Sequence, residues 1–197
     1  MNTIAERLRE ETRPIHEQTE HLLYADALRT GTLSADQYRH LLLTHFGYHR
    51  SLESAIDQHP DFFADYEPDT RRKTPWLAAD LAQLHLSQPF TDDVFTAWSP
   101  TELLGAAYVG EGSMLGGKTV WHYLQQCSAV VPLLKNARFY QGYGSETGQR
   151  WRAFGAFLTQ KAAGRPDVVV DAAQRAFLIY HKLFKAVQLI LTETNPV

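Results

Sequence analysis

The sequence has little of what marks a secreted, membrane-spanning or nucleic-acid-binding protein. Its 197 residues include one cysteine, Cys127, which excludes an internal disulfide and a metal cluster held by cysteines alone. No apolar run approaches the length of a membrane span, and the opening MNTIAERLREETRP lacks the apolar core of a signal peptide. The net charge of -3 provides no excess of positive charge for nucleic acid phosphates. These absences predict a cytoplasmic protein whose main partner is neither a membrane nor a nucleic acid.

Strand patterns are nearly absent as well. The β-branched runs at 130–131 and 168–170 are short and lie close to prolines, so they do not predict a sheet. Helix signals are frequent instead, and Ser34 and Ser99 each open a capping box. The predicted helices lie near 3–23 (interrupted at Pro14), 34–58, 74–86, 99 into a glycine-rich stretch, 145–162 and 170–192. We therefore expect a single all-α domain over 1–197 with six to eight helices.

The glycine-rich stretch GEGSMLGGKT, residues 110–119, allows two interpretations. Gly112, Gly117, Lys118 and Thr119 fit the G-x-x-x-x-G-K-T pattern of a phosphate-binding loop. Such a loop requires a strand before it and a parallel sheet around it, and the sequence predicts neither. A helix is favoured, although each glycine in a helix interior costs about 0.8–1 kcal/mol relative to alanine.

Within that helix, Gly105, Gly112 and Gly116 are predicted to lie near one face. A face without side chains lets another object approach the backbone. That object is either a second, closely packed helix or a flat ligand, and spacing alone does not choose between them.

Histidine spacing provides two candidate metal ligands. His45 and His49 are four residues apart, but they lie on a helix rich in aromatic residues, which favours a structural role at the edge of the core. Arg9, His16 and Glu20 fall near one helical stripe, where a neutral imidazole could bind iron while a carboxylate orients its other nitrogen. The pattern alone leaves an ordinary helix histidine as the alternative.

Several segments, in order along the chain, resemble the haem oxygenase family. They are LREETRPIHEQTE, TGTLSADQYRHLL, YVGEGSMLGGKTV, FYQGYGSETGQRWRAFGAFL and AFLIYHKLFKAV. The first is similar to the family's proximal helix, whose histidine ligates haem iron, and the third is similar to its glycine-rich distal helix. The resemblance covers nearly the whole chain and includes bacterial members that accompany bacteriophytochromes. It implies an all-α fold with haem between these two helices.

The resemblance also implies which residues form the site. His16 would ligate the iron, Arg9 would reach a haem propionate, and Arg152 (less directly Arg150) would do so from a later helix. The implied haem-binding residues are Arg9, His16, Glu20, Tyr108 and Arg152. The implied catalytic distal surface consists of Gly112, Ser113, Gly116 and Gly117.

One departure from the family pattern concerns the distal side. Many members carry an aspartate directly after the first distal glycine, where it orders water, whereas this chain has Ser113. The adjacent Glu111 is expected to point about 100–200° away around a regular helix, which makes it a poor substitute. The basic run at 71–73 follows the loop-like YEPDT and is expected to be solvated surface.

The activity implied by the resemblance is oxidative opening of haem to biliverdin, carbon monoxide and ferrous iron. Haem would be both substrate and oxygen-activating group, and an external ferredoxin or flavoprotein reductase would supply electrons. The serine at position 113 motivates a second hypothesis, a haem carrier or sensor without turnover. A third, a thiaminase-like enzyme of the same fold, would need a reactive cysteine in the cavity, and Cys127 lies beyond the glycine-rich stretch.

Overall fold

The computed structural model describes residues 3–88 and 93–194, with side-chain environments up to residue 191. Within these ranges the chain forms helices and turns and no strand. The α-helices are α1 (Ile4–Glu11), α2 (Arg13–Leu22), α3 (Ala25–Arg29), α4 (Ala35–Asp57), α5 (Pro60–Phe63), α6 (Thr74–Gln83), α7 (Pro100–Leu124), α8 (Thr147–Lys161) and α9 (Pro166–Thr194). The 3₁₀ turns are η1 (Ala64–Tyr66), η2 (Pro68–Arg71), η3 (Val131–Leu133), η4 (Phe139–Gln141) and η5 (Gly144–Glu146). The all-α prediction is confirmed.

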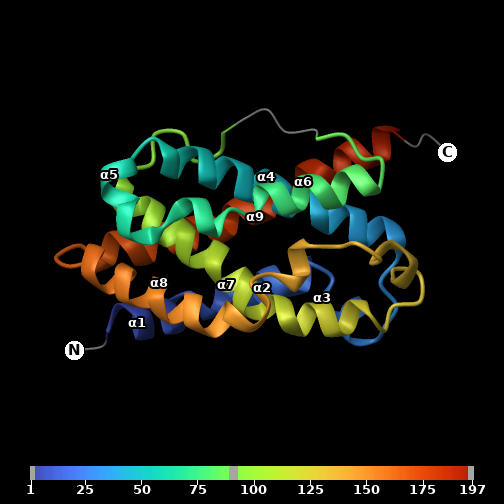
Figure 1. The fold of residues 1–197 in the computed structure, drawn as a ribbon, viewed down its shortest axis with the longest axis horizontal. Helices are drawn as coiled ribbons and strands as arrows, with labels where there is room; N and C mark the ends of the chain where they lie inside the picture. The colour runs from blue at the N-terminus through green and yellow to red at the C-terminus, as the bar shows by residue number, and fades with distance from the viewer. Residues whose placement is uncertain (1–2, 89–92, 195–197) are drawn as a thin grey trace.

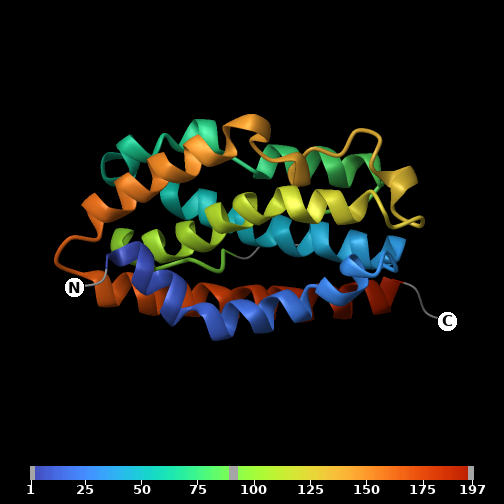
Figure 2. The same ribbon diagram turned by 90° about the horizontal axis from the view of Figure 1, so that it is seen from below.

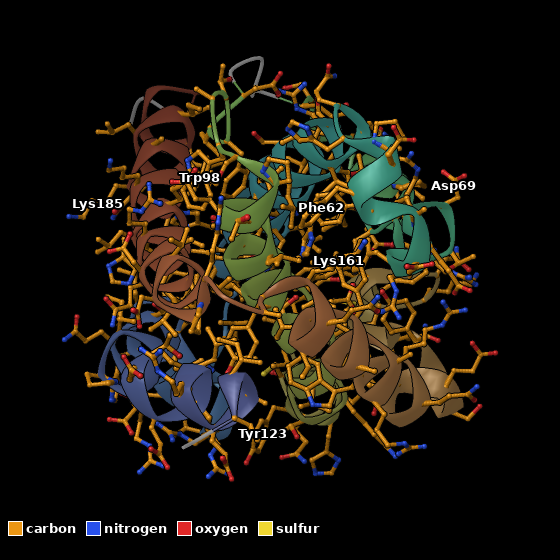
Figure 3. The ribbon with its side chains drawn as sticks, turned by 90° about the vertical axis from the view of Figure 1, so that its left-hand side faces the viewer. Phe62, Asp69, Trp98, Tyr123, Lys161 and Lys185 are labelled. Atoms are coloured by element: carbon orange, nitrogen blue, oxygen red, sulfur yellow. The ribbon has the colours of Figure 1, made fainter. Side chains whose placement is uncertain are left out.

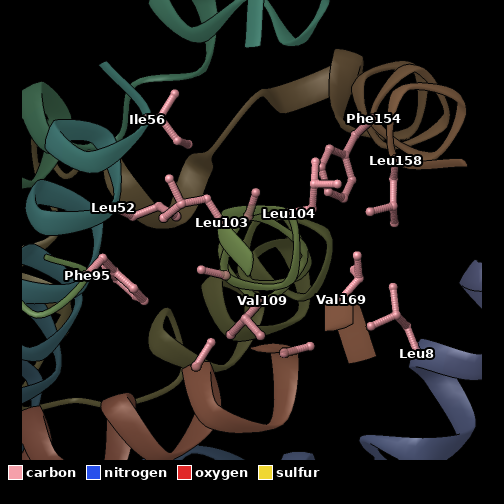
Figure 4. Packing of buried hydrophobic residues seen from close by; sticks show 14 of the residues in the cluster. Leu8, Leu52, Ile56, Phe95, Leu103, Leu104, Val109, Phe154, Leu158 and Val169 are labelled. Carbon is pink, nitrogen blue, oxygen red and sulfur yellow. The ribbon is translucent and has the colours of Figure 1, made fainter. Parts of the chain in front are cut away.

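Helix α7 runs through the centre of the molecule and packs against α4, α8 and α9 (Figure 1). The N-terminal helices α1 and α2 lie along α9, and α3 reaches back to α7 (Figure 2). The buried side chains of Leu103, Leu104 and Val109 on α7 are surrounded by residues of the neighbouring helices (Figure 4). Exposed charged residues such as Lys185 and Asp69 point outward (Figure 3). Helix α7 thus contacts most of the elements whose residues could form a functional site.

The capping signals place the two long helices correctly. Ser34 Oγ accepts a hydrogen bond from Gln37 N (3.1 Å), and Gln37 Oε1 accepts one from Ser34 N (2.9 Å). Ser99 and Glu102 form the same reciprocal pair at the start of α7. Because each box satisfies backbone N–H groups that a helix start leaves unpaired, it fixes where the helix begins.

The predicted interruption near Pro14 is also confirmed. Helix α1 ends at Glu11, Thr12 separates the helices, and α2 begins at Arg13. Thr12 is buried, and its hydroxyl donates to the carbonyl of Leu8 at 2.6 Å. The break lets the second segment turn along α9.

The valine run at 168–170 belongs to the first turns of α9, which starts earlier than predicted. Its buried residues include Ala173, Phe177, Tyr180, Phe184 and Val187. Across 3–88 and 93–194, no helix combines the length with the apolar character that crossing a membrane requires.

Candidate functional site

A cavity of about 870 Å³ lies between the N-terminal helices α1–α3 and the central helix α7. Its remaining walls come from α4, η4, α8 and α9. Its apolar lining includes Leu28, Val120, Phe139, Trp151, Phe154, Leu158 and Phe177. Small-molecule sites commonly have volumes of about 300–1,000 Å³, apolar walls and a few convergent polar groups. The cavity therefore has the size and chemistry for a large, mostly apolar ligand.

The N-terminal wall presents one imidazole to this cavity. His16 lines it from α2, and its ring meets Phe177 of α9 edge-on at 5.5 Å between centroids. Its Nε2 lies 3.9 Å from Glu20 Oε1, which is longer than a hydrogen bond. One turn further along, Thr19 Oγ1 lies 2.8 Å from Nε2 of His181, so a hydrogen bond joins α2 to α9 close to the imidazole. His16 itself is half-exposed, and within the described residues its ring has no closer polar partner than Glu20.

The opposite wall, on α7, presents bare backbone. A Cβ built on Gly112 or Gly116 would meet no atom within 4 Å, and both glycines line the cavity. Gly105 differs, because its Cβ would lie 2.5 Å from Val169 O and from the backbone nitrogen of Ala173. The two explanations for these glycines therefore both hold, at different positions: Gly105 permits close packing of α7 on α9, while Gly112 and Gly116 leave space at the cavity.

Gly117 does not line the cavity. It is buried, and a Cβ there would lie 3.5 Å from the carbonyl oxygen of Tyr140. The stretch 110–119 is helical throughout, so its N–H groups follow the helix instead of forming a phosphate cradle. The phosphate-loop hypothesis is wrong for that reason.

Ser113 lines the cavity between these glycines and belongs to a buried polar group. Its hydroxyl donates to the carbonyl of Gly110 at 2.7 Å and lies 3.5 Å from Nε2 of His49. Burial raises the pKa of Tyr180, whose contact with the Ser113 hydroxyl lowers it by less. The hydroxyl of Tyr180 lies 3.3 Å from Nδ1 of His45. The α7 wall of the cavity, called the distal wall from here on, is thus polar, and the polar groups named above are uncharged.

Both histidines of that wall are held neutral by their surroundings. Burial lowers the pKa of His45 to about 3. Burial also lowers the pKa of His49 well below its ordinary value, and the nearby Lys73 and His45 lower it further. Neutral imidazoles can donate through one nitrogen and accept through the other. Sequence spacing placed these residues at the core edge without revealing that His45 lines the cavity.

Guanidinium groups line the cavity at two places. Arg9 of α1 is exposed, and its nearest carboxylate, Glu10, is 3.9 Å away. Tyr108 of α7 lies in the same region, since it contacts Thr12 and feels the charge of Arg9, although burial raises its pKa overall. Arg29 of α3 lines the cavity elsewhere and is paired with an aspartate of its own helix. Arg9 and Tyr108 were expected here, whereas Arg29 was not.

Arg152 and Arg150 were expected to reach the ligand from α8, but the structure directs both away from the cavity. Arg152 is exposed, and its guanidinium lies against Gly148. Arg150 pairs with Glu146 at 3.0 Å and stacks over the ring of Tyr143. The α8 residues that line the cavity are Trp151, Phe154, Gly155 and Leu158.

Glu111 points to the other side of α7, where it is fully buried. Its carboxylate contacts Arg71 Nη1 at 3.1 Å and the ammonium of Lys73, and it accepts hydrogen bonds from Tyr66 (2.9 Å) and Tyr143 (3.1 Å). The prediction that 71–73 is solvated surface is wrong for Arg71 and Lys73, which are 4% and 3% exposed. With its acceptors occupied, Glu111 cannot replace a carboxylate facing the cavity.

Comparison with known proteins agrees with this arrangement. A profile of the family described as Heme oxygenase matches residues 2–186. The chain belongs to the haem oxygenase family. A relative in Xanthomonas campestris pv. campestris (strain 8004), also described as "Heme oxygenase", is 33% identical over 167 residues, covering 81% of this chain and 96% of the relative. The chain is accordingly an enzyme of the haem oxygenase type.

Solved structures of haem oxygenases share the fold. The NO- and CO-bound haem oxygenase from Neisseria meningitidis aligns with a TM-score of 0.78 at 19% identity, over 95% of this chain and 92% of that one. Haem oxygenase-2 from Synechocystis sp. PCC 6803, solved in complex with haem and NO, aligns with a TM-score of 0.74 at 17% identity, over 98% and 88% of the two chains. At such identities the similarity concerns the fold.

The donor set of the cavity fits a ligand that brings its own metal. No group of three or more histidine, cysteine, aspartate or glutamate residues that could hold a bare metal ion occurs in the described part of the chain. Cys127 is buried outside the cavity, and its Sγ donates to the carbonyl of Tyr123 at 3.3 Å, so the thiaminase-like alternative lacks its nucleophile. One imidazole opposite open backbone suits the iron of a haem oxygenase substrate.

Proposed function

We propose that the protein cleaves haem to biliverdin, carbon monoxide and ferrous iron. The observation that carries the proposal is the pair of facing walls, with His16 on one and the open backbone of Gly112 and Gly116 on the other. Membership of the haem oxygenase family supports the same activity. Bound haem supplies both the ring that is opened and the iron that activates oxygen. Electrons would come from an external ferredoxin or flavoprotein reductase.

The proposal gives His16 the role of the protein ligand to haem iron. The imidazole is half-exposed on the cavity side, and its ring orientation is limited by the edge contact with Phe177. Glu20, whose Oε1 lies 3.9 Å from Nε2, would orient the imidazole by accepting a hydrogen bond from the ring nitrogen that does not bind iron. The hydrogen bond between Thr19 and His181 fixes α2 to α9 one turn beyond His16 and so helps to position the imidazole.

The α7 wall would orient the reaction because it lacks side chains at two positions. Because Gly112 and Gly116 carry no side chain and have open space in front of them, a flat ring can lie against the helix backbone. Ser113 places a hydroxyl between them, where water could be held close to the reacting face. Arg9, at the cavity edge, supplies a positive charge for a propionate, which fixes the rotation of the ring.

Substitution of His16 tests the proposal most directly. In His16→Ala, haem should lose its protein ligand, so the Soret band of the ferric complex should shift and turnover should disappear. Because the side chain is 51% exposed, stability without haem should change by less than about 0.5 kcal/mol. The matched control is His21→Ala, an exposed histidine of the same helix that lies outside the cavity. An unchanged Soret band and normal turnover in His16→Ala would overturn the ligand assignment.

A carrier or sensor that binds haem without opening it is the second candidate, favoured by the absence of a carboxylate from the described distal wall. Incubating the haem-loaded protein under air with ascorbate, or with a ferredoxin system, distinguishes the enzyme from the carrier. Conversion of the Soret band to a biliverdin spectrum supports the enzyme, whereas a persistent haem spectrum supports the carrier. A phytochrome gene beside this one would indicate chromophore supply, and haem-uptake genes would indicate iron release.

A further inference from the structure

The short turn η4 forms part of the wall of the large cavity. Its first two residues, Phe139 and Tyr140, both line the cavity and are 1% and 5% exposed. Their rings contact the imidazole of His45, at 4.7 and 5.7 Å between centroids respectively. A flat ring lying between the His16 wall and the α7 wall turns its edge toward the remaining walls, of which η4 is one. The position of η4 therefore limits how such a ring can sit.

The residues next to η4 in the sequence do little to hold this turn in place. It is a single 3₁₀ turn of three residues, and such turns have poorer hydrogen-bond geometry than an α-helix. The side chain of Arg138, which precedes the turn, does not cap it. Because the first N–H groups of a helical turn have no partner within it, they need an acceptor from elsewhere.

Asp80 supplies that acceptor from α6, 58 positions before Arg138 in the chain. Its Oδ1 accepts a hydrogen bond from the backbone nitrogen of Arg138 (2.8 Å), and its Oδ2 accepts one from that of Phe139 (3.0 Å). The carboxylate is buried, so these two donors replace water. Burial raises the pKa of Asp80, and the hydrogen bonds from Phe139 and Arg138 oppose that rise. Hydrogen bonds to a carboxylate are roughly twice as strong as those between neutral groups, which suits a long-range attachment.

The other side of η4 packs against α7. A Cβ built on Gly117 would lie 3.5 Å from the carbonyl oxygen of Tyr140. A Cβ built on Gly142, which ends η4 with a φ of +53°, would lie 3.6 Å from Sδ of Met114. The turn is thus fixed between α6 and the helix that carries the distal wall, and Asp80 provides the polar part of its attachment.

We propose that Asp80 is a positioning residue for the haem oxygenase reaction. By holding η4, it sets the edge against which the haem ring rests and so selects which bridging carbon of the ring is opened. Asp80 does not line the cavity itself and acts through Phe139 and Tyr140. The inference rests on the proposed function for the reaction, whereas the attachment of η4 belongs to the chain alone.

Asp80→Asn tests the attachment in the protein without haem. Asparagine has nearly the same shape, but its amide nitrogen cannot accept a hydrogen bond, so one of the two backbone N–H groups loses its partner. Amide hydrogen exchange at Arg138 and Phe139 should become about 10-fold faster, because the local opening of η4 no longer breaks a hydrogen bond to a charged group.

The same variant tests the seating of the ring once haem is added. Haem should bind about 10-fold more weakly, and the Soret band of the ferric complex should shift. The ratio of biliverdin isomers should differ from that of the wild type, which a loss of stability alone would not produce. Asp80→Glu keeps both acceptors but moves them by one methylene group. It should retain slow amide exchange and still change the isomer ratio, and it serves if Asp80→Asn does not fold.

The matched control is Glu53→Gln. Glu53 of α4 is also a partly buried carboxylate that holds backbone nitrogens, those of Lys73 (2.6 Å) and Thr74 (3.1 Å), but it lies outside the large cavity. Its replacement removes the same charge from the same kind of contact and should leave haem affinity, the Soret band and the isomer ratio unchanged.

Three results would overturn the role of Asp80. They are unchanged amide exchange at Arg138 and Phe139 in Asp80→Asn, faster exchange with wild-type haem affinity and isomer ratio, and equal shifts in Glu53→Gln. Wild-type protein that binds haem without opening it would contradict the proposed function instead, and amide exchange together with haem affinity would then decide whether Asp80 positions the wall.

Discussion

Two glycines of helix α7 serve opposite purposes at different points along the helix. Near its start, Gly105 is pressed against the backbone of α9, with less room than a methyl group needs. Further along, at the cavity, Gly116 faces at least 4 Å of open space, where alanine would fit without any contact. A glycine at a position where alanine would fit lowers helix stability without improving the packing of the protein. The open glycines therefore point to a ligand, whereas the crowded one is explained by the fold alone.

Two neighbouring residues that do lie on different sides of α7 differ in charge. Glu111 and Ser113 are two residues apart, and Glu111 turns into a buried cluster with Arg71 and Lys73 while Ser113 faces the cavity. The helix thus keeps its one buried carboxylate for packing and presents a neutral hydroxyl to the ligand. Whether a residue of α7 contacts the rest of the protein or lines the cavity determines whether its replacement should affect folding or haem binding.

The largest expected loss of stability comes from replacing Glu111, which is packed against the rest of the protein. Glu111→Ala leaves Arg71 and Lys73 buried without their carboxylate, and removing one partner of a buried ion pair costs about 3–5 kcal/mol. Urea denaturation of the protein without haem should show this loss in the free energy of unfolding. Glu17→Ala, an exposed carboxylate of α2, is the control and should change stability little. A loss below 1 kcal/mol in Glu111→Ala, by the same measure, would mean that the cluster is not a structural element.

Gly105→Ala tests the packing of α7 against α9 through sterics. Its Cβ would lie 2.5 Å from backbone atoms of α9, which cannot rotate away as a side chain can. We expect a loss of about 3 kcal/mol, the upper end for overpacking, despite alanine's better helix propensity. The melting temperature without haem measures it, and an unchanged value would show that α7 and α9 separate freely.

The sequence predicted the long helices well because the residues that determine where each helix starts are close together in the sequence. The capping boxes at Ser34 and Ser99 need only residues three positions away, and the break at Thr12 follows from Pro14. The five-residue helix α3 was missed because it begins after Tyr24, which adopts a left-handed conformation that nothing in its own sequence announces.

The site was predictable where it coincided with a family motif and less so where it depended on packing. His16, Gly112 and Gly116 lie within such motifs, and all three line the cavity. Arg29 does not, and its place there is set by how α3 turns toward α7. The burial of Arg71 was equally hidden, since its carboxylate partner lies 40 positions further along the chain.

A third prediction concerns pH and the histidines packed beside α7. His45 has a folded-state pKa of about 3, below the ordinary value near 6.5, so the unfolded chain binds the extra proton as pH falls. Its contribution to stability is complete above pH 6.5 and is lost on acidification, by about 2 kcal/mol at pH 5. Denaturation between pH 7.5 and 5 measures the slope, which His45→Gln should reduce. His21→Gln, on the exposed surface of α2, is the control, and an unaltered slope in His45→Gln would contradict the assignment.

The smallest effect on stability, and the sharpest on binding, should come from Gly116→Ala on the cavity side. The new methyl group meets no protein atom, so the helix should gain up to about 1 kcal/mol of stability without haem. The same methyl group occupies space that a flat ring would use, and haem should bind about 10-fold more weakly, equivalent to about 1.4 kcal/mol. Gly148→Ala, at an exposed glycine of α8 outside the cavity, should leave haem affinity unchanged. Haem titration followed at the Soret band compares the two, and wild-type affinity in Gly116→Ala would remove the open side of α7 from the haem site.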